Sequence, residues 1–297
     1  MRTRSWVPLM MALPPIVLTA LFVAYPALTA ALYSLGDVHA VSPAITDIAH
    51  RQIAARHGLT LEVYRRLFMN PQFRADVAVS LSVTLWSVFA VLLIGYTVAF
   101  YYRFGRGARR PWTSVFFLVP MFIPVVIASY AMASFFNAGG WFDAGLFHLG
   151  VANPPAPSFT NLGIILAQIW VNIPFAVLLL GSSLGTISPS LIEAARDVGA
   201  GAWTVFWRVI LPMTTLQGTI VATFTAIGIF GSFTIPYLIG PNAPQMLGVA
   251  MDSYYATYAE PQQAEAMAVI TFLLAAVAGV PYLWATARAR SARGGAA

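Results

Sequence analysis

The chain alternates between long uncharged stretches and short segments that carry its charges. A helix needs about 20 apolar residues to cross the hydrocarbon core of a bilayer, and each of these stretches is long enough. Their apolar residues run continuously, whereas the strands of a membrane barrel show short alternating segments. The pattern therefore predicts an all-α polytopic membrane protein with about six transmembrane helices, at residues 9–35, 78–102, 112–136, 161–185, 213–240 and 263–286.

The composition narrows the possible functions. Of the 297 residues, 59% are hydrophobic and only 9% are charged, against roughly a quarter in a soluble domain. The chain has no Cys, and every basic residue is Arg. Disulfides and cysteine metal sites, Schiff-base chemistry on Lys and the Lys of a phosphate-binding P-loop are therefore excluded. We expect no ATP hydrolysis, no catalytic residues and no resident cofactor on this chain.

Ionisable side chains are almost absent from the expected spans. Glu265, near the start of the last span, is the exception, and the histidines fall in loops, at His39, His50, His57 and His148. Their spacing is weak for a metal site. Ion-coupled carriers keep ionisable groups at membrane depth, and an enzyme embedded in the membrane needs a nucleophile–base or metal set. Both classes are disfavoured, and no metal site is expected.

The arginines predict the orientation of the spans. Eleven of the 16 lie in the first segment, the segments after the second and fourth spans, and the tail, at Arg2, Arg4, Arg103, Arg106, Arg109, Arg110, Arg196, Arg208, Arg288, Arg290 and Arg293. The other five lie in a long mixed-charge loop, which carries less weight. The first uncharged run is longer than the core of a signal peptide, about 7–15 residues. We expect both termini in the cytoplasm and, without a basic patch on a soluble face, no nucleic-acid partner.

Residues 186–212, which follow the fourth span, predict two short helices joined by a turn. Ser190 followed by Glu193 fits a capping box, in which each residue caps the amide of the other. Gly199 suits the left-handed conformation that ends a helix. The first helix then carries an apolar stripe made of Leu191, Ala195 and Val198.

The second short helix has an apolar face with helical spacing, made of Trp203, Phe206, Trp207 and Ile210. Such an amphipathic helix–turn–helix can lie on the lipid surface or insert into the groove of a partner protein. Composition by itself leaves the two interpretations about even.

This loop resembles the EAA loop of the permease subunits of ATP-binding-cassette importers. That motif has EAA, three residues, a Gly, then a spaced aromatic or aliphatic residue and a terminal LP; the matching residues are Glu193, Ala194, Ala195, Gly199, Ala200, Phe206, Val209, Leu211 and Pro212. Residues 59–84 resemble the segment that leads such permeases into their core, and residues 231–247 resemble the polyamine-type subgroup. The resemblance covers most of residues 59–286, whereas residues 37–58 have no assignment.

The resemblance implies a division of the chain. Its parts are a first span with an outer loop (1–58), a permease core (59–286), a coupling loop inside the core (186–212) and a basic cytoplasmic tail (287–297). In this family the coupling helix lies in a groove of an ATPase subunit and transmits ATP-driven closure to the spans. The residues implied to do so here are Glu193, Ala194, Ala195, Asp197, Gly199, Ala200 and Phe206.

The resemblance also implies the partners. They are two ATPase subunits that bind ATP and Mg, a second permease in a heterodimer, and an external solute-binding protein. The lipid bilayer is a bacterial inner membrane. A membrane anchor without transport activity is the alternative of another class, and co-purification with an ATPase would separate the two.

Uncharged polar and aromatic side chains in the spans are the candidates for a substrate pathway, namely Gln168, Asn172, Phe230, Phe233 and Tyr237. Hydrogen bonding and packing between helices are the alternative role for these groups. The subgroup resemblance implies a small polar solute such as a polyamine. A cation is held by acids or aromatic faces, and the spans supply aromatics without acids, so a sugar or oligosaccharide is the alternative substrate.

Overall fold

The computed structural model describes residues 6–49, 52–54, 58–104 and 115–294, and within them the regular structure is entirely helical. Two compact units form, the first from Met1–Arg74 with Ala250–Phe272 and the second from Ala75–Val249 with Leu273–Ala297. Several residues used in the sequence analysis lie outside the described ranges, namely Arg2, Arg4, Arg51, Arg56, Arg106, Arg109, Arg110, His50, His57, the start of the third expected span at 112–114 and the end of the tail at 295–297.

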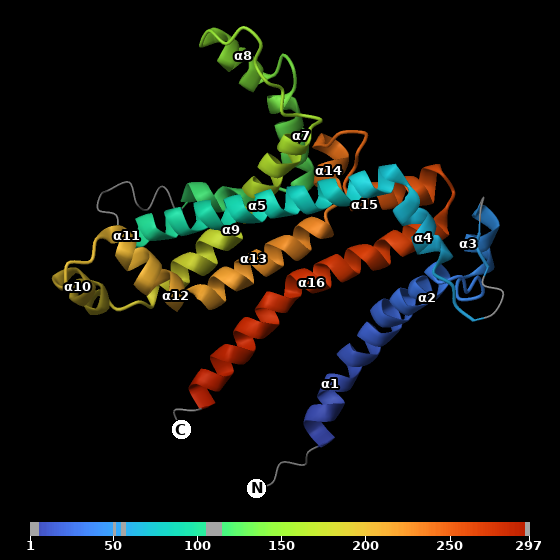
Figure 1. Ribbon diagram of the computed structural model, residues 1–297, viewed down its shortest axis with the longest axis horizontal. Helices are drawn as coiled ribbons and strands as arrows, with labels where there is room; N and C mark the ends of the chain where they lie inside the picture. Colours follow the sequence, from blue (N-terminus) through green and yellow to red (C-terminus); the bar gives the residue numbers. More distant parts are fainter. Residues whose placement is uncertain (1–5, 50–51, 55–57, 105–114, 295–297) are drawn as a thin grey trace. The chain divides into compact units, whose positions relative to one another are not determined.

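The first unit is built from helices at both ends of the chain (Figure 1). Its elements are α1 (Trp6–Thr19), the π-helical turn η1 (Ala20–Ala24), α2 (Tyr25–Ser34), α3 (Pro43–Ile48), α4 (Glu62–Met69), the first turn of α5 (Pro71–Phe104), the end of α15 (Leu247–Asp252), η4 (Ser253–Thr257) and the start of α16 (Pro261–Gly294). Gln262 connects distant segments, because its amide nitrogen donates to the carbonyls of Tyr33 at 2.9 Å and of Ile53 at 3.0 Å.

The second unit holds a helical run at residues 115–118 and the remaining numbered helices. They are η2 (Val119–Phe122), α7 (Val125–Phe136), α8 (Trp141–His148), α9 (Asn161–Gly185), α10 (Pro189–Asp197), α11 (Ala202–Val205), the π-helical η3 (Phe206–Ile210), α12 (Leu211–Met213), α13 (Thr215–Phe230) and α14 (Thr234–Ile239), together with the rest of α5, α15 and α16. Figure 1 shows α5, α9 and α13 running side by side, with α10 and α11 at one end.

Two buried apolar clusters hold α5, α9 and α13 together. The loop-end cluster consists of Val91, Ala99, Ala176, Leu180, Leu184, Ile187, Ile192, Val205, Ile210 and Val221. The far-end cluster consists of Val79, Val83, Ile164, Ala167, Ile229, Ile235, Ile239 and Met246. Gly95 lets α5 approach α9 closely, because a Cβ there would lie 3.0 Å from the Cβ of Ala176. Both ends of the three-helix core are therefore packed by apolar side chains.

The predicted fold class is confirmed. By length and composition, five helices within the described residues can cross a membrane, namely Met10–Ser34, Pro71–Phe104, Val125–His148, Asn161–Gly185 and Pro261–Arg288. A sixth span forms if Ala202–Met213 and Thr215–Phe230, which meet at a bend of 72°, are counted together.

Two of the expected spans are interrupted, so their prediction as single helices was wrong. In the third, α7 begins only at Val125, because Pro120 and Pro124 cannot donate helical hydrogen bonds; Pro120 lies in a short 3-10 turn, Val119–Phe122, that precedes α7. In the fifth, α13 ends at Phe230 and a separate short helix, α14, follows.

Candidate functional site

Helix α10 begins two residues earlier than the capping box predicts. Ser188 is the residue before the helix and Pro189 takes its first position, where the fixed φ of proline suits a helix start. The hydroxyl of Ser190 pairs with that of Ser188 at 2.6 Å, and the start of the helix has no side-chain cap. The predicted capping box between Ser190 and Glu193 is therefore wrong, because the proline moves the helix start upstream of Ser190.

The end of α10 forms as predicted. Gly199 has a φ of +85°, in the left-handed region that side chains disfavour. Its N–H donates to the carbonyl of Arg196 at 2.8 Å, and the N–H of Ala200 donates to the carbonyl of Ala195 at 3.0 Å. These two bonds make a Schellman motif. Gly199 thus fixes the direction in which the chain leaves α10 toward α11.

The apolar stripe on α10 differs from the predicted one. Ile192 is 4% exposed and belongs to the loop-end cluster, whereas Leu191 is 42% and Val198 84% exposed. Ala195 is packed against the cluster, as predicted, and so are Ala200 and Phe206. The helix is rotated so that Ile192 and Ala195, three residues apart, face the core. The inward face of the loop is therefore joined to the ends of α5, α9 and α13.

The opposite face of α10 is open. Glu193, Ala194 and Asp197 are exposed, and so is Gly199 at the turn. A carboxylate on such a face can form a charge-assisted hydrogen bond with an Arg of a partner, and a small side chain at Ala194 permits close approach. The seven residues implied by the family resemblance thus divide into an outward set and an inward set.

Aromatic rings connect the second short helix to α5. The ring of Phe206 lies edge-on to Tyr96 and Phe100, at centroid distances of 6.0 and 6.3 Å. Trp203 and Trp207 contact each other at 5.5 Å but are 73% and 49% exposed. The predicted apolar face is thus divided, with Phe206 packed inward and the two indoles open to lipid or to a partner.

The sequence did not predict the bend in the helical path between this loop and α13. The helical path bends by 72° between α12 and α13, at Thr214, whose hydroxyl pairs with the Tyr96 hydroxyl at 3.2 Å. Gly218, one turn into α13, makes room for that ring, because a Cβ there would lie 2.5 Å from the Tyr96 hydroxyl oxygen. Small residues in this span are frequent, but nothing in the sequence singles out Gly218.

The five candidates for a substrate pathway do not share one surface. Gln168 is 2% and Phe230 6% exposed, so both are buried within the chain. Asn172 donates from its side chain to the backbone carbonyl of Gln168 at 2.8 Å. Phe233 and Tyr237 are 40% and 58% exposed and stack with centroids 5.0 Å apart. Only this aromatic pair offers an open face.

An acidic side chain that the expected spans left out is buried at the far end of α5. Asp76 is 2% exposed, because α5 begins at Pro71 and carries it inside the helix. Its Oδ1 accepts from the N–H of Gln245 at 2.8 Å, and Ser80 accepts from the N–H of Leu247 at 2.9 Å. These contacts hold the segment after α14 against α5.

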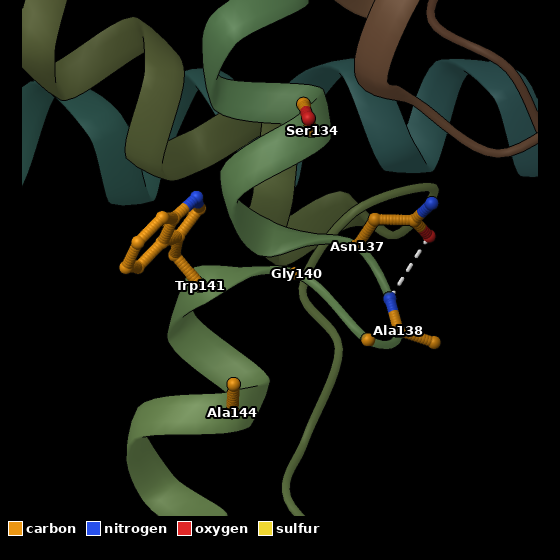
Figure 2. A pocket seen from close by; sticks show the side chains of 7 residues that line it. Ser134, Asn137, Ala138, Gly140, Trp141 and Ala144 are labelled. Atoms are coloured by element: carbon orange, nitrogen blue, oxygen red, sulfur yellow. Dashed lines mark hydrogen bonds between the residues drawn. The ribbon is translucent and has the colours of Figure 1, made fainter.

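A surface hollow of about 460 Å³ lies at the turn between α7 and α8. Figure 2 shows Trp141 and Asn137 pointing to different sides of Gly140, and Asn137 accepts from the N–H of Ala138 at 2.9 Å. None of the candidate residues lines this hollow. Across the described part of the chain, no group of three or more His, Asp or Glu side chains is placed to hold a metal ion.

The fold and the loop define a class: a helical membrane protein whose short amphipathic helix–turn–helix is packed into the ends of its spans. Residues 90–293 match the family of binding-protein-dependent transport system inner membrane components. The chain belongs to this family, which confirms the resemblance to permeases of ATP-binding-cassette importers.

Individual relatives share about 30% of their residues with this chain over the matched regions. The spermidine/putrescine transport system permease protein PotB of Haemophilus influenzae is 31% identical over 176 residues, which cover 58% of this chain and 61% of that protein. PotB of Escherichia coli is 30% identical over 175 residues, covering 58% and 63%. The matched regions thus span less than two thirds of these relatives.

Solved structures show the same fold. A bacterial ABC transporter involved in the import of alginate has a chain that matches with a TM-score of 0.74 and 18% identity, over 97% of this chain and 96% of its own length. The MetNI methionine ABC transporter matches with a TM-score of 0.51 and 18% identity, over 71% and 94%.

Proposed function

We propose that this chain is the transmembrane permease subunit of an ATP-driven, binding-protein-dependent importer that moves a small polar solute by alternating access. The two faces of the coupling loop carry this proposal. Glu193, Ala194 and Asp197 are open to a partner, while Ile192 and Phe206 of the same loop pack on the spans. A displacement of α10 by a partner bound to its open face is therefore transmitted to α5, α9 and α13 through close-packed side chains.

In this proposal, two ATPase subunits bind ATP and Mg outside this chain. One of them receives α10 in a groove, in the way that helices commonly dock on partner proteins. A second, different permease completes the membrane part, and a solute-binding protein delivers the solute on the other side of a bacterial inner membrane. The arginine distribution supports placing both termini and the coupling loop in the cytoplasm.

For the solute, we propose a polyamine-like or other small polar compound. The relatives named as spermidine/putrescine permeases support this class. The open stack of Phe233 and Tyr237 is an aromatic face of the kind that binds cations. Aromatic faces suit sugars as well, so a sugar or oligosaccharide is the second candidate.

Co-purification with an ATPase tests the proposal. Tagged chain expressed with the adjacent reading frames should retain an ATPase subunit, and vesicles that contain both should hydrolyse ATP faster when the loaded binding protein is added. Ala194→Trp, which places a large side chain on the open face, should lose the ATPase, whereas Leu191→Trp, at an exposed site beside it, serves as the matched control. If the wild-type chain retains no ATPase, the importer proposal is wrong and the membrane anchor is favoured.

A further inference from the structure

Several buried polar atoms of the second unit have no hydrogen-bond partner, and three hydroxyls and one amide among them lie between the two apolar clusters. These four are Thr84 Oγ1 and Ser87 Oγ of α5, Gln168 Nε2 of α9 and Thr225 Oγ1 of α13. The four residues are between 0% and 5% exposed. We name these four residues the polar seam, and all of them are uncharged.

The polar seam lies between the two apolar clusters. On each of the three helices, its residues fall between a buried member of the far-end cluster and a buried member of the loop-end cluster. The flanking residues are Val83 and Val91 on α5, Ala167 and Ala176 on α9, and Ile229 and Val221 on α13. On each of the three helices, a buried polar side chain without a partner therefore lies between the two apolar clusters.

Among the Ser and Thr hydroxyls of α5 and α13, the lack of a partner is confined to the seam, although other side chains such as Tyr102 and Gln217 also have a buried atom without one. Within membranes, Ser and Thr hydroxyls commonly bond to a carbonyl one turn back in their own helix. Every Ser and Thr of α5 and α13 outside the seam has a carbonyl partner, the acceptors being Asp76 for Ser80, Val79 for Ser82, Leu93 for Thr97, Leu211 for Thr215, Thr215 for Thr219 and Ala278 for Thr223. The three seam hydroxyls have no such acceptor.

A buried polar group without a partner costs free energy that water or another polar molecule can recover. The bilayer core supplies no water to such groups. They gain partners only when the helices part and water, or a solute that carries hydroxyl or amine groups, reaches them.

We propose that the polar seam is a conformational device that favours separation of α5, α9 and α13. The apolar clusters hold the three helices together at both ends, and the seam works against that packing in the middle. Its effect on the packed arrangement is independent of transport, and its use in a transport cycle rests on the proposed function.

Thermal unfolding of the purified chain tests the effect on packing. Thr225→Val keeps the shape of the side chain and removes the unpaired hydroxyl, so it should raise Tm by about 2–4 °C. Thr223→Val, on the same helix, removes a hydroxyl that donates to Ala278 at 3.2 Å and should lower Tm. Thr84→Val provides a second seam variant on another helix, expected to act as Thr225→Val does. A Tm lowered by both seam variants, as by Thr223→Val, overturns the proposal.

Cysteine labelling tests the separation itself, and the chain has no native Cys. In the assembled transporter, Thr225→Cys should react several-fold faster with a water-soluble thiosulfonate when ATP is present than when it is absent. Ile229→Cys, in the far-end cluster and 0% exposed, should stay slow in both conditions. Equal rates for Thr225→Cys with and without ATP, in a preparation that hydrolyses ATP, overturn the proposal. Failure to retain an ATPase counts against the proposed function instead, and the thermal unfolding result then tests the polar seam.

Discussion

Gly199→Val should uncouple ATP hydrolysis from uptake while the chain still folds. At a φ of +85°, replacing glycine by a residue with a Cβ destabilises the folded backbone conformation by roughly 1–2 kcal/mol. The added Cβ meets no atom within 4 Å, so the cost arises from backbone conformation and not from a collision. The turn relieves the strain by giving up the bonds that close α10, which changes the angle between α10 and α11.

A penalty of this size changes an equilibrium by a factor of about 5–30. We therefore expect the amount of solute taken up per ATP hydrolysed to fall by a factor in this range. Expression and co-purification with the ATPase should stay close to wild type, because the turn is exposed and the loop-end cluster is untouched.

Two matched variants separate backbone strain from side-chain bulk. Gly201→Val adds the same side chain in the same loop, where φ is −68° and the added Cβ also meets nothing within 4 Å, so coupling should persist. Gly199→Asn should retain most coupling, because Asn tolerates the left-handed conformation better than other residues with a Cβ.

The assay uses vesicles that contain the chain, its ATPase and an external solute-binding protein, with uptake and phosphate release measured in the same sample. Normal uptake per ATP in Gly199→Val would refute the reasoning. An equal loss in Gly201→Val would also refute it, because bulk and not strain would then be the cause.

Two further predictions concern stability, measured by thermal unfolding in detergent. Asp76→Ala should lower the free energy of unfolding by about 1.5–3 kcal/mol, because it removes a charged acceptor from a backbone N–H in the segment after α14. Asp76→Asn keeps an oxygen acceptor and should lower it by less. Equal losses in the two variants would contradict this role of Asp76. Ile192→Ala should lower the free energy of unfolding by about 2–5 kcal/mol, because it opens a cavity in the loop-end cluster. Leu191→Ala, at a position 42% exposed, should change it by no more than about 0.5 kcal/mol. The reverse order would mean that Leu191 is the buried residue, as the sequence predicted.

The sequence by itself determined the membrane class and the glycine turn that ends α10. Charge is excluded from the bilayer core, so the gaps between charged residues located the spans to within a few residues at 161–185 and 9–35. The left-handed Gly199 was predictable as well, because the conformational freedom of glycine is a property of the residue and not of its surroundings.

Packing against distant segments decided the rest. Leu191 and Ile192 are neighbours with similar apolar character, and only packing in the loop-end cluster determines that Ile192 is the buried one. Asp76 reads as a charge that ends a span, yet a backbone N–H far along the chain satisfies its carboxylate inside the helix. Periodicity shows that a face is apolar or polar, but which face is buried depends on partners that only the tertiary structure brings together.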